Sequence, residues 1–175
     1  MTTRRLTLTA MLTALLCICG PLTLPLGPIP LSLTTAVLML MALLLGMGPS
    51  MLCCGVYLLM GLTGLPVFSG FNGGAGALMG PTGGFLLGYL PMTALCGFLC
   101  ARTDKPLMHA LACLAGTLLL YITGTAWYCW QTGAEANAAL TVCVLPFLPG
   151  DLLKIAAVTT LGHAVRKRLK RAGLL

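Results

Sequence analysis

The sequence contains very little charge. Only 7% of its 175 residues are charged, whereas 58% are hydrophobic and the mean hydropathy is +1.00. A typical water-soluble domain has about 25% charged residues. This composition excludes an ordinary soluble domain and predicts an all-α integral membrane protein, because a helix satisfies its own backbone hydrogen bonds within lipid.

Several motifs of catalysis and metal binding are absent. No lysine follows a glycine, so the phosphate-binding pattern GxxxxGK[ST] does not occur, and neither His109 nor His163 belongs to an HExxH pattern. The nine cysteines include no CxxC pair and lie mostly in apolar runs, which is typical of buried hydrophobic side chains. We therefore expect no catalysis, no cofactor and no metal. The energy to concentrate a solute would have to come from another protein.

The ten lysines and arginines lie almost entirely at three places. Nine of them form an N-terminal pair, a central pair and a C-terminal block: Arg4, Arg5, Arg102, Lys105, Arg166, Lys167, Arg168, Lys170 and Arg171. Cytoplasmic loops of membrane proteins collect Lys and Arg, so we expect all three places on that side. The block at 166–175 directly follows a hydrophobic run. This favours a basic cytoplasmic tail over a segment that binds nucleic acid.

Hydrophobic segments separated by short breaks predict six transmembrane helices. The segments are Leu6 to about Leu24, Leu33–Met47, Met51–Leu62, Met79–Ala101, Leu107–Trp130 and Val142–Val165. The second and third are shorter than the roughly 20 residues that cross a bilayer. An even number of crossings must nevertheless separate the N-terminal and central cations, so Leu31–Thr63 counts as two helices, with Gly46, Gly48 and Pro49 as the turn between them. Residues 1–175 then form a single transmembrane substrate-binding domain with both termini in the cytoplasm.

Three connections fall on the outer side in this topology, and none contains Lys or Arg: Pro21–Ser32, Leu65 to about Met79, and Gln131–Thr141. The second of these opens the segment Leu65–Tyr89, called here the glycine-rich segment, which contains eight glycines in 25 residues. Such a segment could be a flexible linker, but its aromatic residues Phe68, Phe71 and Tyr89 are unusual in a linker. We therefore predict an ordered cover over a site, with Phe68, Phe71 and Tyr89 as candidate apolar walls, since long ordered loops are usually functional.

Asp151 and Lys154 lie within the last hydrophobic segment, where charges are costly and usually functional. Pro146 and Pro149 precede Asp151, so we expect the last helix to begin near Gly150 and Asp151 to cap or begin it. Lys154 then lies one turn further along the same face. The pair could simply neutralise each other within a helix bundle. The alternative that we favour is a binding site for a small polar ligand, with the carboxylate as acceptor and the ammonium as donor.

Two further features allow two interpretations each. Ala10 and Ala14 form an AxxxA pattern, which could pack against another helix of this chain or against an external partner. Trp127, near the outer end of the fifth segment, could belong to an interfacial aromatic belt or to the wall of a ligand cavity.

At this point the sequence resembles a known family, BioY, the biotin-binding S components of energy-coupling factor (ECF) vitamin transporters. The motifs that carry the resemblance are GLPVFSGFNGGAGALMGPTGGFLLGY at 64–89, LPFLPGDLLK at 145–154, PIPLSLTT from Pro28, and the AxxxA pattern. The first two together are highly specific. The resemblance extends over nearly the whole chain and implies an ECF S-component bundle in a bacterial-type plasma membrane.

The resemblance also implies roles for particular residues. Biotin would lie at the outer face under the first and third outer connections, without catalysis. The residues implied as ligand contacts are Asp151 and Lys154 as polar anchors, Asn72, Gly73, Thr82 and Gly83 in the glycine-rich segment, and Tyr89 and Trp127 as apolar walls. Ala10 and Ala14 would dock on a transmembrane coupling protein that two cytoplasmic ATPases drive, and the S component would tilt to release biotin inside.

The sequence departs from the family at one motif. Members usually read PxPxTxQT, whereas this chain has Ser32 and Thr34 in place of Thr and Gln. A side-chain amide from the first outer connection is therefore missing here. The alternatives to a biotin S component are an S component for another vitamin and, less favoured, a small intramembrane enzyme that uses Asp151 as its acid or base.

Overall fold

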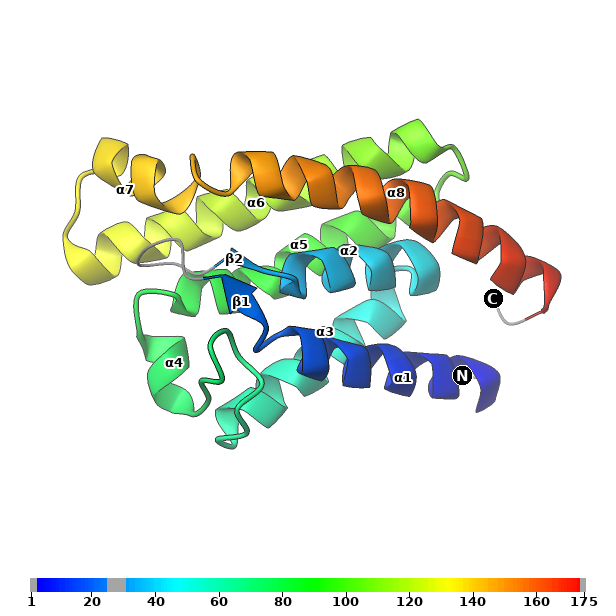
Figure 1. Cartoon of the computed structure of the whole chain (residues 1–175), viewed down its shortest axis with the longest axis horizontal. Helices are drawn as coiled ribbons and strands as arrows, with labels where there is room; N and C mark the ends of the chain where they lie inside the picture. Colours follow the sequence, from blue (N-terminus) through cyan, green and yellow to red (C-terminus); the bar gives the residue numbers. More distant parts are fainter. Residues whose placement is uncertain (1–2, 25–30, 174–175) are drawn as a thin grey trace.

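The fold is a bundle of helices with one short β-ribbon (Figure 1). The structure is a computed structural model and describes residues 3–24 and 31–173. Its elements are α1 (Thr3–Cys19), β1 (Thr23–Leu24), β2 (Leu31–Ser32), α2 (Thr34–Leu45), α3 (Met47–Leu62), α4 (Ala75–Met79), α5 (Gly83–Ala101), α6 (Pro106–Thr132), α7 (Ala136–Cys143) and α8 (Leu148–Arg171). β1 pairs with β2 in antiparallel orientation, so both ends of the first predicted outer connection meet. Its prolines Pro25, Pro28 and Pro30 lie outside the described residues.

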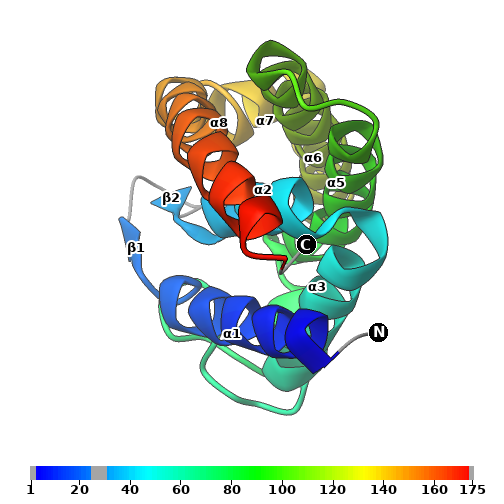
Figure 2. The ribbon, with the colours of Figure 1, turned by 90° about the vertical axis from the view of Figure 1, so that its right-hand side faces the viewer.

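Helix α2 lies in the middle of the bundle, surrounded by α1, α3, α5 and α8 (Figure 2). Its sequence TTAVLMLMALLL contains no charge, and nine of its twelve residues are buried. A helix that is apolar on all sides can be covered by lipid or by other helices. In this bundle the neighbouring helices cover most of α2.

A sharp turn at Gly46 separates α2 from α3, as the short hydrophobic segments predict. Gly46 has φ of 75°, a left-handed conformation that glycine adopts without steric cost. Its N–H donates to the carbonyl of Ala42 and ends α2, and α3 begins at the next residue. Gly48 and Pro49 do not form part of the turn. Both lie in the first turn of α3, where Pro49 requires no N–H.

Helices α5 and α6 are long and apolar enough to cross a membrane. Helices α7 and α8 together pass the same test as a broken pair bent by 49°. In the described ranges 3–24 and 31–173 this gives two or three candidate spans by length and composition, with α2 and α3 as shorter apolar helices. The chain is therefore a multi-pass membrane protein, and six crossings remain a prediction.

The three groups of basic residues lie at one end of the bundle. Figure 1 shows both termini at the same end as the connection between α5 and α6. At this end Arg166 of α8 donates to the carbonyl of Cys100 at 3.0 Å and lies 3.4 Å from the carboxylate of Asp104. The same guanidinium lies 3.2 Å from Nε2 of His109, whose side chain is buried. Arg166 thus connects the end of α8 to α5 and α6.

The last helix begins at Leu148, two residues before the start near Gly150 that we expected, and another short helix precedes it. Helix α7 ends at Cys143, residues 144–147 form turns, and α8 begins at Leu148. Pro146 lies in the break, but Pro149 lies within the first turn of α8, where the missing N–H has no intrahelical partner to lose. Asp151 therefore occupies the first turn of α8 rather than the position before it.

The close approach of α5 to the turn between α2 and α3 should depend on Gly97. A Cβ at this buried residue would lie 2.7 Å from the backbone nitrogen and Cα of Met47. We expect Gly97→Ala to lower the free energy of unfolding by about 1–3 kcal/mol, because the two backbones must move apart. Thermal unfolding of the purified protein in detergent measures the change.

Gly55→Ala is the matched control. A Cβ at Gly55, inside α3, would meet no atom within 4 Å. This variant should be as stable as the natural chain or more stable by up to about 1 kcal/mol, since alanine favours a helix interior over glycine. Equal stability of the two variants would contradict the predicted packing at Gly97.

Candidate functional site

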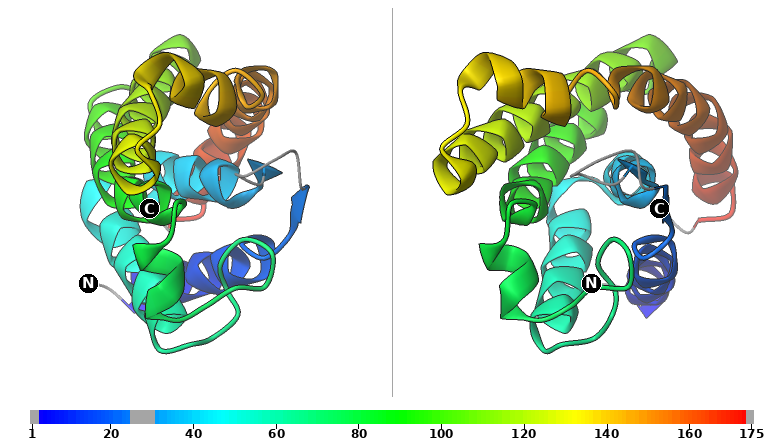
Figure 3. Two further views of the ribbon diagram at one scale, coloured as in Figure 1. Left: turned by 90° about the vertical axis from the view of Figure 1, so that its left-hand side faces the viewer. Right: turned by 60° about the vertical axis from the view of Figure 1, so that its left-hand side comes forward.

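A cavity of about 480 Å³ lies at the end of the bundle opposite the termini. Figure 3 (left) looks onto this end, where α7, α4 with the glycine-rich segment, and the β-ribbon surround α2. The lining residues come from β2, α2, the glycine-rich segment, α6 and the start of α8: Ser32, Thr35, Phe68, Ser69, Asn72, Gly73, Gly76, Ala77, Gly80, Pro81, Thr82, Phe85, Leu86, Tyr89, Leu120, Tyr121, Phe147, Asp151 and Lys154. This volume lies within the range of about 300–1,000 Å³ that is usual for small-molecule sites.

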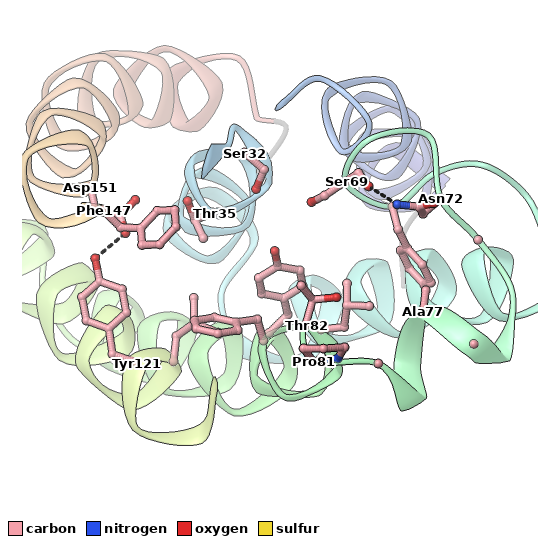
Figure 4. A pocket seen from close by; sticks show the side chains of 18 of the residues that line it. Ser32, Thr35, Ser69, Asn72, Ala77, Pro81, Thr82, Tyr121, Phe147 and Asp151 are labelled. Carbon is pink, nitrogen blue, oxygen red and sulfur yellow. Dashed lines mark hydrogen bonds between the residues drawn. The ribbon is translucent and has the colours of Figure 1, made fainter. Parts of the chain in front are cut away.

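A buried cluster of hydrogen-bonded polar groups forms one end of the cavity (Figure 4). The carboxylate of Asp151 accepts a hydrogen bond from the Tyr121 hydroxyl at 2.6 Å and one from Lys154 Nζ at 2.8 Å. Lys154 also donates to Oγ1 of Thr35 at 3.1 Å. The side chains of Lys154 and Asp151 are only 11% and 7% exposed. The cluster therefore joins α2, α6 and α8 around one buried ion pair.

Asp151 does not use its carboxylate as a helix cap. Its own N–H donates to the carbonyl of Phe147 at 2.8 Å, and both carboxylate oxygens have side-chain partners. The first turn of a helix favours a negative charge. The place of Asp151 in the first turn of α8 and its two side-chain donors together stabilise a negative charge on this buried carboxylate. Lys154 therefore neutralises Asp151, as the first interpretation expected. The pair also borders a cavity, as the second interpretation requires.

The opposite end of the cavity consists of neutral groups of the glycine-rich segment (Figure 4). Asn72 Nδ2 donates to the carbonyl of Ser69 at 3.0 Å, and Phe68 N–H donates to the carbonyl of Asn72 at 2.9 Å. The tight turn between Ser69 and Asn72 contains Gly70 and Phe71, with φ of 72° and 59°. This part of the glycine-rich segment forms a defined turn over the cavity, not an extended linker.

The glycine-rich segment is attached to the bundle at several points. The Tyr57 hydroxyl donates to the carbonyl of Val67 at 3.0 Å, and Gly74 N–H donates to the carbonyl of Gly61 at 2.7 Å. From the other side, the indole N–H of Trp127 donates to the carbonyl of Gly80 at 3.0 Å. These contacts position the segment from both α3 and α6.

Six of the eight predicted ligand contacts line the cavity: Asp151, Lys154, Asn72, Gly73, Thr82 and Tyr89. Gly83 and Trp127 do not. The indole of Trp127 is turned toward Gly80, and Gly83 packs against the backbone of Leu78 beside the indole nitrogen. Both residues support the cover from outside the cavity.

Two other expectations about the cover need correction. Phe71, a predicted wall residue, is 67% exposed and does not line the cavity. None of residues 131–141 lines it either, because most of that connection is α7, which packs on α6. The glycine-rich segment takes the role expected of the third outer connection.

Thr35, Tyr121 and Phe147 are cavity residues that the sequence did not single out. Tyr121 lies in the apolar fifth segment and resembles an interfacial aromatic residue, and Thr35 is one of many threonines. Phe147 lies one turn before Asp151, and its carbonyl accepts the Asp151 N–H. Only the three-dimensional crossing of α2, α6 and α8 brings Thr35 and Tyr121 to the ion pair, and no spacing within the sequence indicates these two contacts.

The chain is a helical multi-pass membrane protein, and it has an apolar cavity beside one buried ion pair. Such a protein can bind a small, partly polar molecule. The family model described as the BioY family matches residues 1–171, and the chain belongs to this family. Biotin transporter BioY2 of Lactococcus lactis subsp. cremoris is 34% identical over 165 residues, which cover 94% of this chain and 91% of that protein. Biotin transporter BioY of Thermotoga maritima is 30% identical over 164 residues, covering 94% and 96%.

A solved structure shows the same fold. It is described as the S-component for biotin from an ECF-type ABC transporter. It matches with a TM-score of 0.89 at 29% identity and covers 95% of each chain. The resemblance that the motifs indicated is therefore confirmed at the level of family and fold.

The ion pair predicts a strong coupling between its two charges. Lys154→Met should lower the free energy of unfolding by roughly 3 kcal/mol, because it leaves the buried Asp151 carboxylate without its cation. Adding Asp151→Asn should restore most of the loss, since the amide carries no charge. Thermal unfolding of both single variants and the double variant in detergent completes the cycle. A double variant as unstable as the sum of the single variants would refute the coupling.

Proposed function

We propose that this chain is the biotin-binding S component of an ECF-type vitamin uptake transporter. The observation that carries the proposal is the Asp151, Lys154 and Tyr121 cluster at the buried end of a cavity with apolar walls. Membership of the BioY family and the match to an S-component structure for biotin support it. The protein binds biotin with high affinity at the extracellular face and contributes to its delivery into the cell.

The chemistry of biotin is complementary to this cavity. Its ureido ring offers two N–H donors and one carbonyl acceptor. The Asp151 carboxylate can accept from an N–H, and Lys154, which donates to Asp151 and Thr35, has a third N–H that can donate to the carbonyl. The thiophane ring and the valeryl chain require apolar surface, which Phe68, Phe85 and neighbouring side chains supply.

Charge determines which end of biotin meets Asp151. Lys154 is already paired with Asp151 at 2.8 Å. A second carboxylate at this buried end would face the negative charge of Asp151, and like charges in a poorly solvated site repel strongly. The neutral ureido ring therefore binds at Asp151, and the carboxylate of biotin points to the end formed by Ser69 and Asn72.

The proposed topology has six transmembrane helices, with the cavity outside and both termini in the cytoplasm of a bacterial-type plasma membrane. The termini and the connection between α5 and α6 lie at the end opposite the cavity, which supports an even number of crossings between the basic groups (Figure 1). Residues 1–175 act as one transmembrane substrate-binding domain, and the basic residues after 165 form its cytoplasmic tail.

Helix α1 is the proposed docking surface for the ECF module. Ala10 and Ala14 are exposed, together with Leu6, Met11 and Ile18, whereas Thr9 and Leu16 face the bundle. The AxxxA pattern therefore does not pack within this chain. It presents small residues on an apolar surface, which suits close approach of a helix of a transmembrane coupling protein. Two cytoplasmic ATPases bound to that protein supply the energy.

The proposal includes no catalysis and no cofactor. An S component for thiamine or riboflavin is the main alternative, and direct competition of these vitamins against labelled biotin distinguishes it. An intramembrane enzyme with Asp151 as acid or base would convert its ligand, so recovery of chemically unchanged biotin from the protein counts against it.

Asp151→Asn should weaken biotin binding strongly. A hydrogen bond to a charged group contributes about 1.5–3 kcal/mol, so the dissociation constant should rise roughly ten- to a hundredfold. Titration of the purified protein with labelled biotin measures it, and its thermal unfolding shows that the variant is folded. Glu135→Gln makes the same change at an exposed acid outside the cavity and should bind normally. Equal affinities of the two variants would refute the site.

Ala10→Leu combined with Ala14→Leu should abolish co-purification with a coupling protein and spare biotin binding. Two added leucine side chains prevent the close approach of another helix. Ala156→Leu combined with Ala157→Leu is the control, because both alanines are exposed on α8. Normal co-purification of the α1 variant would show that the docking surface lies elsewhere.

A further inference from the structure

The walls of the cavity are poor in cations. Residues 6–101 contain no Lys, Arg or His. This stretch supplies β2, α2 and the glycine-rich segment, which form most of the cavity wall, and it includes residues 25–30. Among the described lining residues Lys154 is the only basic one.

The positive charge of Lys154 is already used within the protein. Nζ donates to Asp151 at 2.8 Å and to Thr35 at 3.1 Å, and the pair is buried. A ligand carboxylate would have to compete with Asp151 for this ammonium and would lie close to a second negative charge. Lys154 is therefore not available as the counter-ion of a bound carboxylate.

The opposite end of the cavity is neutral and open to solvent. Asn72 and Gly73 are exposed there, whereas Asp151 is buried. The polar side chains at this end are the hydroxyls of Ser69 and Thr82 and the amide of Asn72. Hydroxyl groups can donate or accept, and the amide nitrogen of Asn72 already donates to the Ser69 carbonyl. These groups can bind a carboxylate, a carboxamide or an ester.

We propose that the site recognises biotin by its ring system and does not require its carboxylate, so that neutral biotin amides and esters are ligands of the same site. Biotin joined through an amide to the side chain of lysine belongs to this class, and hydrolysis of biotin-bearing proteins would supply it. The inference rests on the proposed function, because it takes the ureido ring to bind at Asp151. It extends that function from one vitamin to its carboxyl conjugates.

Hydration explains why the carboxylate contributes so little. At an exposed position a charged group keeps most of its water, and single charge interactions there are weak. Replacing the carboxylate by an amide removes a charge that no cation of the wall neutralises. A change to the ureido ring, in contrast, leaves the buried Asp151 or Lys154 without its ligand partner.

Competition against labelled biotin on the purified full-length protein tests the proposal. Biotinamide and biotinyl-lysine should compete within about tenfold of biotin, and biotin methylated on a ureido nitrogen should compete at least about a hundredfold less well. If biotin binds but biotinamide is weaker by more than tenfold, this inference is wrong and the proposed function stands. If biotin itself does not bind, the proposed function is wrong and this inference falls with it.

A designed cation provides a second test with a matched control. Ser69→Lys places an ammonium at the neutral end, and Ser69→Gln has a neutral side chain of similar reach. The ratio of biotin to biotinamide affinity should rise about threefold in Ser69→Lys at low salt, return toward one at high salt, and stay unchanged in Ser69→Gln. An unchanged ratio in Ser69→Lys would show that the carboxylate is not at this end and would overturn the inference.

Discussion

The ion pair of Asp151 and Lys154 is the interaction on which the site depends. Two charges buried at 7% and 11% exposure are stable only with partners, and each has one besides the other. Tyr121 of α6 donates to the carboxylate, and Thr35 of α2 accepts from the ammonium. Three helices that are distant in sequence are therefore connected at one point. The polar groups of this cluster are thus hydrogen-bonded to one another, and apolar side chains form much of the remaining cavity wall.

The two ends of the bundle have different chemistry. At the cavity end the polar groups are few, mostly neutral and arranged around a space. At the opposite end the guanidinium of Arg166, on α8, contacts Cys100, Asp104 and His109 and so connects α8 to α5 and α6. The sequence places nearly all of its cations at that second end. A bundle with so little charge can thus have an orientation in the membrane and a selective site at the same time.

The sequence predicted those features that composition and local backbone chemistry determine. Gly46 separates α2 from α3 because glycine tolerates a positive φ, and Asp151 and Lys154 stand out because charge is rare in an apolar run. It did not predict how α6 is rotated about its axis. Tyr121 faces the cavity and Trp127 faces Gly80. Small and polar residues such as Cys113, Thr117 and Gly124 mark the buried face of α6, but only the packing of the helices places Tyr121 beside Asp151. The start of α8 was placed two residues too late, since Pro146 and Pro149 are alike in sequence and only Pro149 lies in a helix.

Helix α8 is continuous from Leu148 to Arg171 and has a fixed contact near each end. Asp151 and Arg166 are separated by 15 residues, or about 22 Å at 1.5 Å per residue. If α8 pivoted by about 10° at Asp151, the guanidinium of Arg166 would move by about 4 Å, more than the length of its hydrogen bond to Cys100. A rigid tilt of this helix at its ligand end would therefore break the contacts of Arg166 at the other end of the bundle.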